Sequence, residues 1–261
     1  MLQVLANGIR TAYDVAGDGP DVVLVHGWMA SKRYWQEASR KLPGFRVWTP
    51  DLYGFGDTEK PGNGYTLDGY AKFLEGFLDA VGVKKAAIIG HSMGGAVVAW
   101  TAIRSPQRFW ALGLIDAALA GITGPPPAWS AEPVMRLFMR IADTSRGFGR
   151  MTIKGMFGVR EPESRIILEE AQKADVRAAA ASGTMMSKPT DWGPLGGLKV
   201  PALVVYGEND FLVARGMDKE IESLLKVEAD YLEDCGHLPM LEQPKTFYHT
   251  LAAFLDEHKP K

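Results

Sequence analysis

Short apolar runs alternate with amphipathic segments along most of the chain. The continuous apolar runs lie at 22–25, 86–89, 111–115 and 202–206. Runs of this length are typical of strands that are buried on both faces of a sheet. Between them, residues 70–81 carry apolar side chains at helical spacing, and residues 95–103 predict a helix that ends before Pro106. This alternation predicts the α/β class, with helices covering both faces of a parallel sheet.

The first residues predict a β-hairpin in front of this pattern. Residues 3–5 and 9–14 flank Asn7-Gly8, a dipeptide that tolerates the positive φ angles of a tight hairpin turn. A further strand is expected at 45–49, before Pro50.

The alternation breaks in the middle of the chain and then returns. Residues 121–127 are rich in Gly and Pro, and no good strand follows until Val200. The remaining expected elements are helices at 34–42, 131–142, 161–181, 214–225 and 245–254 and a strand at 227–232. We therefore predict a core domain made of residues 1–119 and 196–261, with a helical cap at 120–195 inserted into it.

Charge and cysteine content narrow the classes of function. The 261 residues include 29 Lys and Arg against 31 Asp and Glu, a net charge of -2, so we expect no nucleic-acid partner. Cys235 is the single cysteine and cannot form an internal disulfide. Residues 1–7 do not have the pattern of a signal peptide, and no segment predicts a transmembrane helix. We expect a cytoplasmic monomer or homodimer that has no membrane partner.

The clearest chemical motif is Gly90-His91-Ser92-Met93-Gly94, which matches Gly-x-Ser-x-Gly. A predicted buried strand precedes it and a predicted helix follows it. In that context the small residues permit a sharp strand-to-helix turn, which exposes the hydroxyl of Ser92 as a nucleophile. A glycine-rich turn with a surface serine is the alternative, and the partners described next weigh against it.

A serine nucleophile needs a base and a carboxylate that orients the base. His237 is the candidate base, because it lies in a loop after a predicted strand. Asp210 directly follows the strand at 202–206 and is the best candidate for the carboxylate. Asp116, at the end of the preceding strand, is the second choice, and Asp234 is close to His237 in sequence. The order Ser, Asp, His is that of the α/β-hydrolases.

An oxyanion hole needs two N–H donors near the nucleophile. The backbone amide of Met93, directly after Ser92, is one. The second is expected from the loop after the strand at 22–25, where Trp28 would donate its backbone N–H and His26 would brace the loop.

Apolar residues near these positions and in the predicted cap suggest a hydrophobic acyl or aryl pocket. The candidate substrate-binding residues are Trp28, Phe138, Met139, Met156, Leu212 and Leu238. The spacing of His, Cys, Asp and Glu does not predict a metal site, and we expect no cofactor.

Five segments together resemble the α/β-hydrolase fold superfamily over nearly the whole chain. They are His26-Gly27-Trp28, Asp51-Leu52-Tyr53-Gly54-Phe55-Gly56-Asp57, the Ser92 motif, Gly207-Glu208-Asn209-Asp210 and Gly236-His237. The resemblance implies a mostly parallel eight-stranded sheet flanked by helices, with a helical cap after strand six. It also argues against the superfamily's haloalkane dehalogenases and epoxide hydrolases, which have aspartate where this chain has Ser92. Serine esterases, enol-lactonases and haloperoxidase-like esterases are closest in pattern, and meta-cleavage carbon–carbon hydrolases share Ser-Met-Gly-Gly.

The sequence therefore predicts a serine hydrolase that cleaves carboxylic esters of small to medium, largely apolar substrates through an acyl-enzyme. One alternative is carbon–carbon bond hydrolysis of meta-cleavage-type diketones by the same triad. Another is a ligand receptor on the same fold that turns over slowly.

Overall fold

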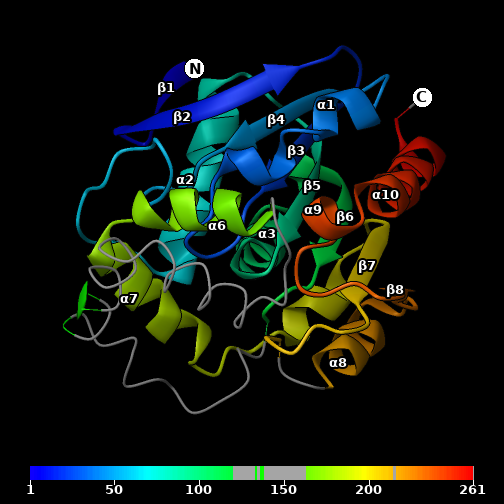
Figure 1. The fold of residues 1–261 in the computed structure, drawn as a ribbon. Coiled ribbons are helices and arrows are strands. Elements are labelled where there is room, and N and C mark those ends of the chain that lie inside the picture. Colours follow the sequence, from blue (N-terminus) through cyan, green and yellow to red (C-terminus); the bar gives the residue numbers. More distant parts are fainter. Residues whose placement is uncertain (120–132, 134–135, 138–162, 214–215, 261) are drawn as a thin grey trace.

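The computed structural model describes residues 1–119, 133, 136–137, 163–213 and 216–260. Its centre is one eight-stranded sheet in the order β1-β2-β4-β3-β5-β6-β7-β8 (Figure 1). The strands are β1 (Leu2–Ala6), β2 (Ile9–Ala16), β3 (Asp21–Val25), β4 (Arg46–Pro50), β5 (Ala86–His91), β6 (Phe109–Ile115), β7 (Ala202–Gly207) and β8 (Asp230–Leu232). β2 pairs antiparallel with β1 and β4, and all other neighbours are parallel. The predicted α/β class and the mostly parallel eight-stranded sheet are confirmed.

The N-terminal hairpin forms as its turn dipeptide predicts. Asn7 and Gly8 have φ angles of +48° and +80°, and β1 pairs with β2 from Leu2 opposite Tyr13 to Ala6 opposite Ile9. Two consecutive positive φ angles give the turn a twist that matches the twist of the strands.

Helices cover both faces of the sheet (Figure 1). The helical segments are η1 (Lys32–Trp35), α1 (Ala38–Lys41), α2 (Leu67–Ala80), α3 (Met93–Arg104), η2 (Pro106–Arg108), α6 (Glu163–Gln172), α7 (Val176–Met186), η4 (Gly193–Gly197), α8 (Met217–Leu225), α9 (Pro239–Glu242) and α10 (Pro244–His258). Val23 and Val25 of β3 pack in the core that contains α2, α3 and α8, whereas Val22 and Leu24 pack in the core that contains α1 and α10. A strand buried on both faces needs apolar side chains at every position, which explains the continuous apolar runs.

The predicted helix at 161–181 is two helices, α6 and α7, because Asp175 interrupts it. Asp175 has an extended ψ of 129°, and its carboxylate accepts the backbone N–H of Arg177 at the start of α7. Its own N–H donates to the carbonyl of Gly54, at 2.8 Å. The predicted single helix is therefore divided, because Asp175 caps the start of α7 and directs its own N–H to Gly54 instead of to a helical carbonyl.

Two other predicted elements are shorter than expected. The strand predicted at 227–232 begins only at Asp230, because the N–H of Ala229 donates to the side chain of Glu222. The helix predicted at 214–225 begins at Met217, and residues 214–215 lie outside the described residues. The helix predicted at 131–142 also lies largely outside them. The limits of the predicted cap, 120–195, stay a prediction, although the segment 163–200 is built from helices and loops.

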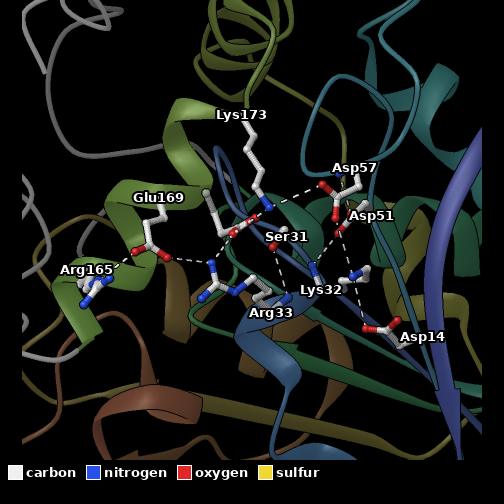
Figure 2. A network of polar contacts seen from close by, with 10 residues as sticks. Asp14, Ser31, Lys32, Arg33, Asp51, Asp57, Arg165, Glu169 and Lys173 are labelled. Atoms are coloured by element: carbon white, nitrogen blue, oxygen red, sulfur yellow. Dashed lines mark hydrogen bonds and ion pairs between the residues drawn. The ribbon is translucent and has the colours of Figure 1, made fainter. Parts of the chain in front are cut away.

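A polar network attaches α6 to the core (Figure 2). The Nη1 atom of Arg33, in η1, lies 3.0 Å from Glu169 Oε2 and 2.6 Å from Glu170 Oε1. Lys173 Nζ lies 3.1 Å from Glu170 and 3.4 Å from Asp57 in the loop after β4. The side chain of Glu170 is fully buried, and its charge is compensated by Arg33 of the core and by Lys173, which directly follows α6.

Lys32, the first residue of η1, extends this network. It is largely buried, with Nζ 3.3 Å from Asp14 and 3.8 Å from Asp57. Asp51 accepts the backbone N–H groups of Lys32 and Asp57, at 2.6 and 2.8 Å. Burial nevertheless raises the pKa of Asp51 to about 6. The loop that contains Asp51 and Asp57 is therefore tied to the start of η1.

Within the described part of the chain, no helix combines the length and apolarity needed to cross a bilayer.

Candidate active site

Ser92 lies at the turn between β5 and α3, with a φ of +54° and a ψ of -119°. Its N–H donates to the carbonyl of Ile115, at 2.9 Å, which fixes the turn to the end of β6. The flanking glycines are required by close approach. A Cβ on Gly90 would lie 2.2 Å from the carbonyl oxygen of Gly94, and one on Gly94 would lie 2.4 Å from the carbonyl oxygen of His26. The strained backbone of Ser92 is thus enforced by its surroundings, as in a nucleophile elbow.

Met93 is the first residue of α3 and is fully buried. The first N–H groups of a helix have no partner inside the helix and carry partial positive charge. Met93 therefore has the position in α3 that the sequence prediction of an oxyanion donor requires, and that role stays a prediction.

The loop after β3, which contains the second predicted oxyanion donor, passes beside Ser92. The Nε2 atom of His26 accepts the N–H of Leu52, at 2.9 Å, so Nδ1 carries the ring proton and donates to the carbonyl of Gly27, at 2.8 Å. Because a trans peptide directs C=O and N–H to opposite sides, this bond turns the N–H of Trp28 away from the His26 ring. A Cβ on Gly27 would lie 3.2 Å from the Cβ of Ser92, so this peptide lies directly beside the serine.

Two further properties of this loop fix its geometry. His26 is fully buried, and desolvation lowers its pKa to about 4, so the ring is neutral at physiological pH and keeps the tautomer just described. The Nε1 atom of Trp28 donates to the carbonyl of Ala179 in α7, at 3.0 Å. Trp28 therefore connects the predicted oxyanion loop to α7.

His237 and Asp210 form a buried hydrogen-bonded pair. His237 Nδ1 lies 2.8 Å from Asp210 Oδ2, and the two side chains are 5% and 3% exposed. The other oxygen of Asp210 accepts the backbone N–H of Leu212, at 2.8 Å. Burial alone would raise the pKa of Asp210, but the charge and hydrogen bond of His237 outweigh it and bring the pKa down to about 2. Asp210 is therefore an anion that holds the imidazole through Nδ1, which leaves Nε2 as the atom able to move a proton.

The other two aspartates considered from the sequence lie differently. Asp234 is exposed, with a φ of +54°, in the turn before Cys235. Asp116 is fully buried, and its Oδ1 accepts the N–H of Gly207 at 2.9 Å. Desolvation, together with the charge of Asp210, raises the pKa of Asp116 well above its ordinary value. Of the three candidates, Asp210 is the one hydrogen-bonded to the His237 ring.

His91 also belongs to this site, and sequence reasoning assigned it only to the turn. Its Nε2–H donates to the backbone carbonyl of His237, at 2.7 Å, and the two rings lie 4.7 Å apart. Burial lowers the pKa of His91 to about 3, so it is a neutral donor. No local pattern could have revealed this contact, because its partner lies 146 residues away in the sequence.

Asp116, Asp210 and His237 are the described residues that could together hold a metal ion, since one ligand atom from each lies within 4.8 Å of the others. A metal bound there would compete with the hydrogen bond between His237 Nδ1 and Asp210, because Nδ1 would have to lose its proton.

The predicted substrate-binding residues are only partly placed. Trp28 and Leu212 are half-buried, and Leu238 is fully buried in the core cluster that contains α10. Phe138, Met139 and Met156 lie outside the described residues. The substrate pocket therefore stays a prediction.

Comparisons with known proteins place the chain in a family. Residues 22–250 match the sequence profile of the family described as "Alpha/beta hydrolase family". The chain is 26% identical to 2-hydroxy-6-oxo-2,4-heptadienoate hydrolase of Pseudomonas putida, over 97% of this chain and 95% of that protein. It is 26% identical to pimeloyl-[acyl-carrier protein] methyl ester esterase of Aliivibrio fischeri, over 94% and 97%. A thermophilic esterase from Thermogutta terrifontis superimposes with a TM-score of 0.80 at 25% identity and 99% coverage of both chains. This chain belongs to the alpha/beta hydrolase family.

Proposed function

We propose that the protein is a serine hydrolase that cleaves carboxylic esters of small to medium, largely apolar substrates. The observation that carries the proposal is the buried hydrogen bond between His237 Nδ1 and Asp210 Oδ2, at 2.8 Å. A hydrolase that uses Ser92 as its nucleophile needs an imidazole held in this tautomer, with Nε2 available as the base. Ser92 at a strained turn between β5 and α3 supports the same reading.

In the proposed reaction, the Oγ atom of Ser92 attacks the ester carbonyl carbon while His237 Nε2 takes the hydroxyl proton. The backbone amides of Trp28 and Met93 stabilise the oxyanion of the tetrahedral intermediate, and Asp210 stabilises the imidazolium. The intermediate collapses as His237 returns the proton to the leaving alkoxide, which departs as the alcohol. Water, deprotonated by His237, then attacks the acyl-enzyme and releases the acid and free Ser92. The scheme requires no cofactor.

Two of the three named relatives support ester hydrolysis. One is a methyl ester esterase and another is a thermophilic esterase, and both match the chain over most of its length. The substrates of these relatives are only proposals for this chain, because about three quarters of the aligned residues differ.

A second candidate is hydrolysis of a carbon–carbon bond in a vinylogous diketone. It is supported by the similarity to 2-hydroxy-6-oxo-2,4-heptadienoate hydrolase. The same nucleophile, base and oxyanion donors could serve both reactions, so the substrate pocket decides between them.

The test is a panel of p-nitrophenyl esters of increasing acyl length, assayed beside a meta-cleavage ring-fission product. The esterase proposal expects multiple turnover of the esters and a loss of several orders of magnitude in kcat with Ser92→Ala. Ser223→Ala, at an exposed serine of α8, is the matched control and should retain activity. Full esterase activity in Ser92→Ala would contradict the mechanism. Preference for the diketone would select the second candidate, and one slow turnover with ligand-induced thermal stabilisation would indicate a receptor.

A further inference from the structure

Asp116 is a buried carboxyl group that the proposed reaction does not use. It directly follows β6 with a φ of +42° and is fully buried. Its N–H donates to the carbonyl of Val205, at 2.8 Å, and its Oδ1 accepts the N–H of Gly207, at 2.9 Å. Its other oxygen, Oδ2, receives no N–H or O–H from the residues that the structure describes. An oxygen buried in this way is costly unless it makes a hydrogen bond.

Asp116 lies against the His237–Asp210 pair, with one ligand atom of each of the three residues within 4.8 Å of the others. Two ionised carboxylates at this separation and depth repel each other strongly, so one of them takes up a proton. A single proton removes the repulsion. It also converts the orphaned oxygen of Asp116 into a hydrogen-bond donor.

The surroundings decide which carboxyl group holds the proton. Asp210 accepts hydrogen bonds from two backbone N–H groups and from the ring of His237, whereas Asp116 accepts one backbone N–H. Hydrogen bonds to a carboxylate stabilise its charged form, so Asp210 keeps the charge. Burial and the charge of Asp210 raise the pKa of Asp116 well above its usual range, in agreement with this assignment.

The other titratable groups around Asp116 favour the same state. The charge of Glu242, in α9, raises the pKa of Asp116 further. Tyr206 and Cys235 retain their own protons, because burial raises the pKa of both groups. His237 is engaged with Asp210 through Nδ1.

We propose that Asp116 is a positioning residue that is protonated at neutral pH and donates a hydrogen bond from its carboxyl group to Asp210. The inference rests on the proposed triad, because it assigns Asp116 a task within that site. The bond holds the Asp210 carboxylate in register with His237. A neutral Asp116 also keeps a second negative charge away from His237, which would otherwise over-stabilise the imidazolium and slow proton return to the leaving group.

Infrared spectroscopy tests the protonation directly. The difference spectrum between the parent protein and Asp116→Asn at neutral pH should show loss of the carbonyl stretch of a protonated carboxylic acid. Loss of carboxylate bands would overturn the proposal, because Asp116 would then be ionised. If Asp116→Asn does not fold, Asp116→Ser supplies the difference spectrum. The result is independent of turnover, so failure of this inference is distinguishable from failure of the proposed function.

Kinetics on the best ester of the panel test the positioning role. Asparagine has the size of a neutral aspartic acid and can both donate to Asp210 and accept from Gly207. We expect kcat/KM of Asp116→Asn within about threefold of the parent, with the acid limb of the pH profile unchanged. Leucine can do neither, so Asp116→Leu should lose about 10- to 100-fold. The role is overturned if both variants lose activity equally, or if the acid limb shifts in Asp116→Asn.

Discussion

The Nε2–H group of His91 donates to the backbone carbonyl of His237 at 2.7 Å, so the residue before the proposed nucleophile holds the loop of the proposed base. His91 ends β5 and His237 follows β8. The nucleophile turn and the base loop are thus joined by one hydrogen bond between fully or nearly fully buried residues. Variants of His91 therefore test whether this hydrogen bond keeps His237 correctly positioned relative to Ser92.

Replacing His91 should impair catalysis without removing any reacting atom. His91→Phe keeps a ring of similar size but cannot donate to the His237 carbonyl, so the loop that positions the His237 imidazole loses this hydrogen bond. We expect kcat/KM to fall about 10- to 100-fold, because small displacements of a base are costly. His91→Gln keeps an N–H donor and is the matched variant, which should retain most of the activity. Steady-state ester hydrolysis measures both, and an undiminished His91→Phe would contradict this role.

Asp210→Asn should remove the charge that orients and stabilises the His237 imidazolium. Asparagine preserves size but favours the wrong tautomer of the histidine, so kcat should fall by about 10⁴. Asp234→Asn is the control, because Asp234 lies close to His237 in sequence yet is exposed. Its kcat should match that of the parent. Equal losses in the two variants would refute the assignment of Asp210.

Acidification should destabilise the protein through its buried neutral histidines. The pKa of His26 is lowered from 6.5 to about 4, chiefly by desolvation. The unfolded chain therefore takes up a proton on this ring before the folded protein does. The stability that depends on neutral His26 is fully present above pH 6.5. It is lost, by an amount on the order of 3 kcal/mol, as the pH falls toward 4.

Asp51 acts in the opposite direction, and this limits the net effect. Burial raises its pKa from 3.8 to about 6, so its contribution to stability increases as the pH falls through this range. Urea unfolding of His26→Gln at several pH values isolates the histidine. We expect a weaker loss of stability on acidification than in the parent or in His249→Gln, which alters an exposed histidine of α10. An unchanged pH dependence in His26→Gln would contradict the prediction.

The attachment of α6 should depend on Glu170 more than on Glu169. Both contact Arg33 Nη1, but the side chain of Glu170 is fully buried and that of Glu169 is 39% exposed. Glu170→Gln leaves partly exposed cations that water can solvate, so we expect a loss of about 1–3 kcal/mol in the free energy of unfolding. Glu169→Gln should cost much less than Glu170→Gln, because water screens the exposed carboxylate of Glu169. Chemical denaturation compares the two, and equal effects would show that burial of Glu170 is unimportant.

The elements of the core were predictable because their signals are local. An apolar run such as 22–25 reports a strand buried on both faces, and Asn7-Gly8 specifies a turn through its own φ angles. Helix limits were less predictable. The break at Asp175 depends on a hydrogen bond to Gly54, far away in the sequence.

The sequence by itself determined the fold class, the strand–turn–helix around Ser92 and the order of the candidate residues, since these follow from residue size and periodicity. Only the tertiary structure decided which aspartate bonds to His237. Asp116 and Asp210 both follow strands, β6 and β7, that are neighbours in the sheet, and their different numbers of N–H donors arise from packing. The contact between His91 and His237 was likewise visible only in the tertiary structure. A hydrogen bond between residues that are 146 positions apart leaves no pattern in the local sequence.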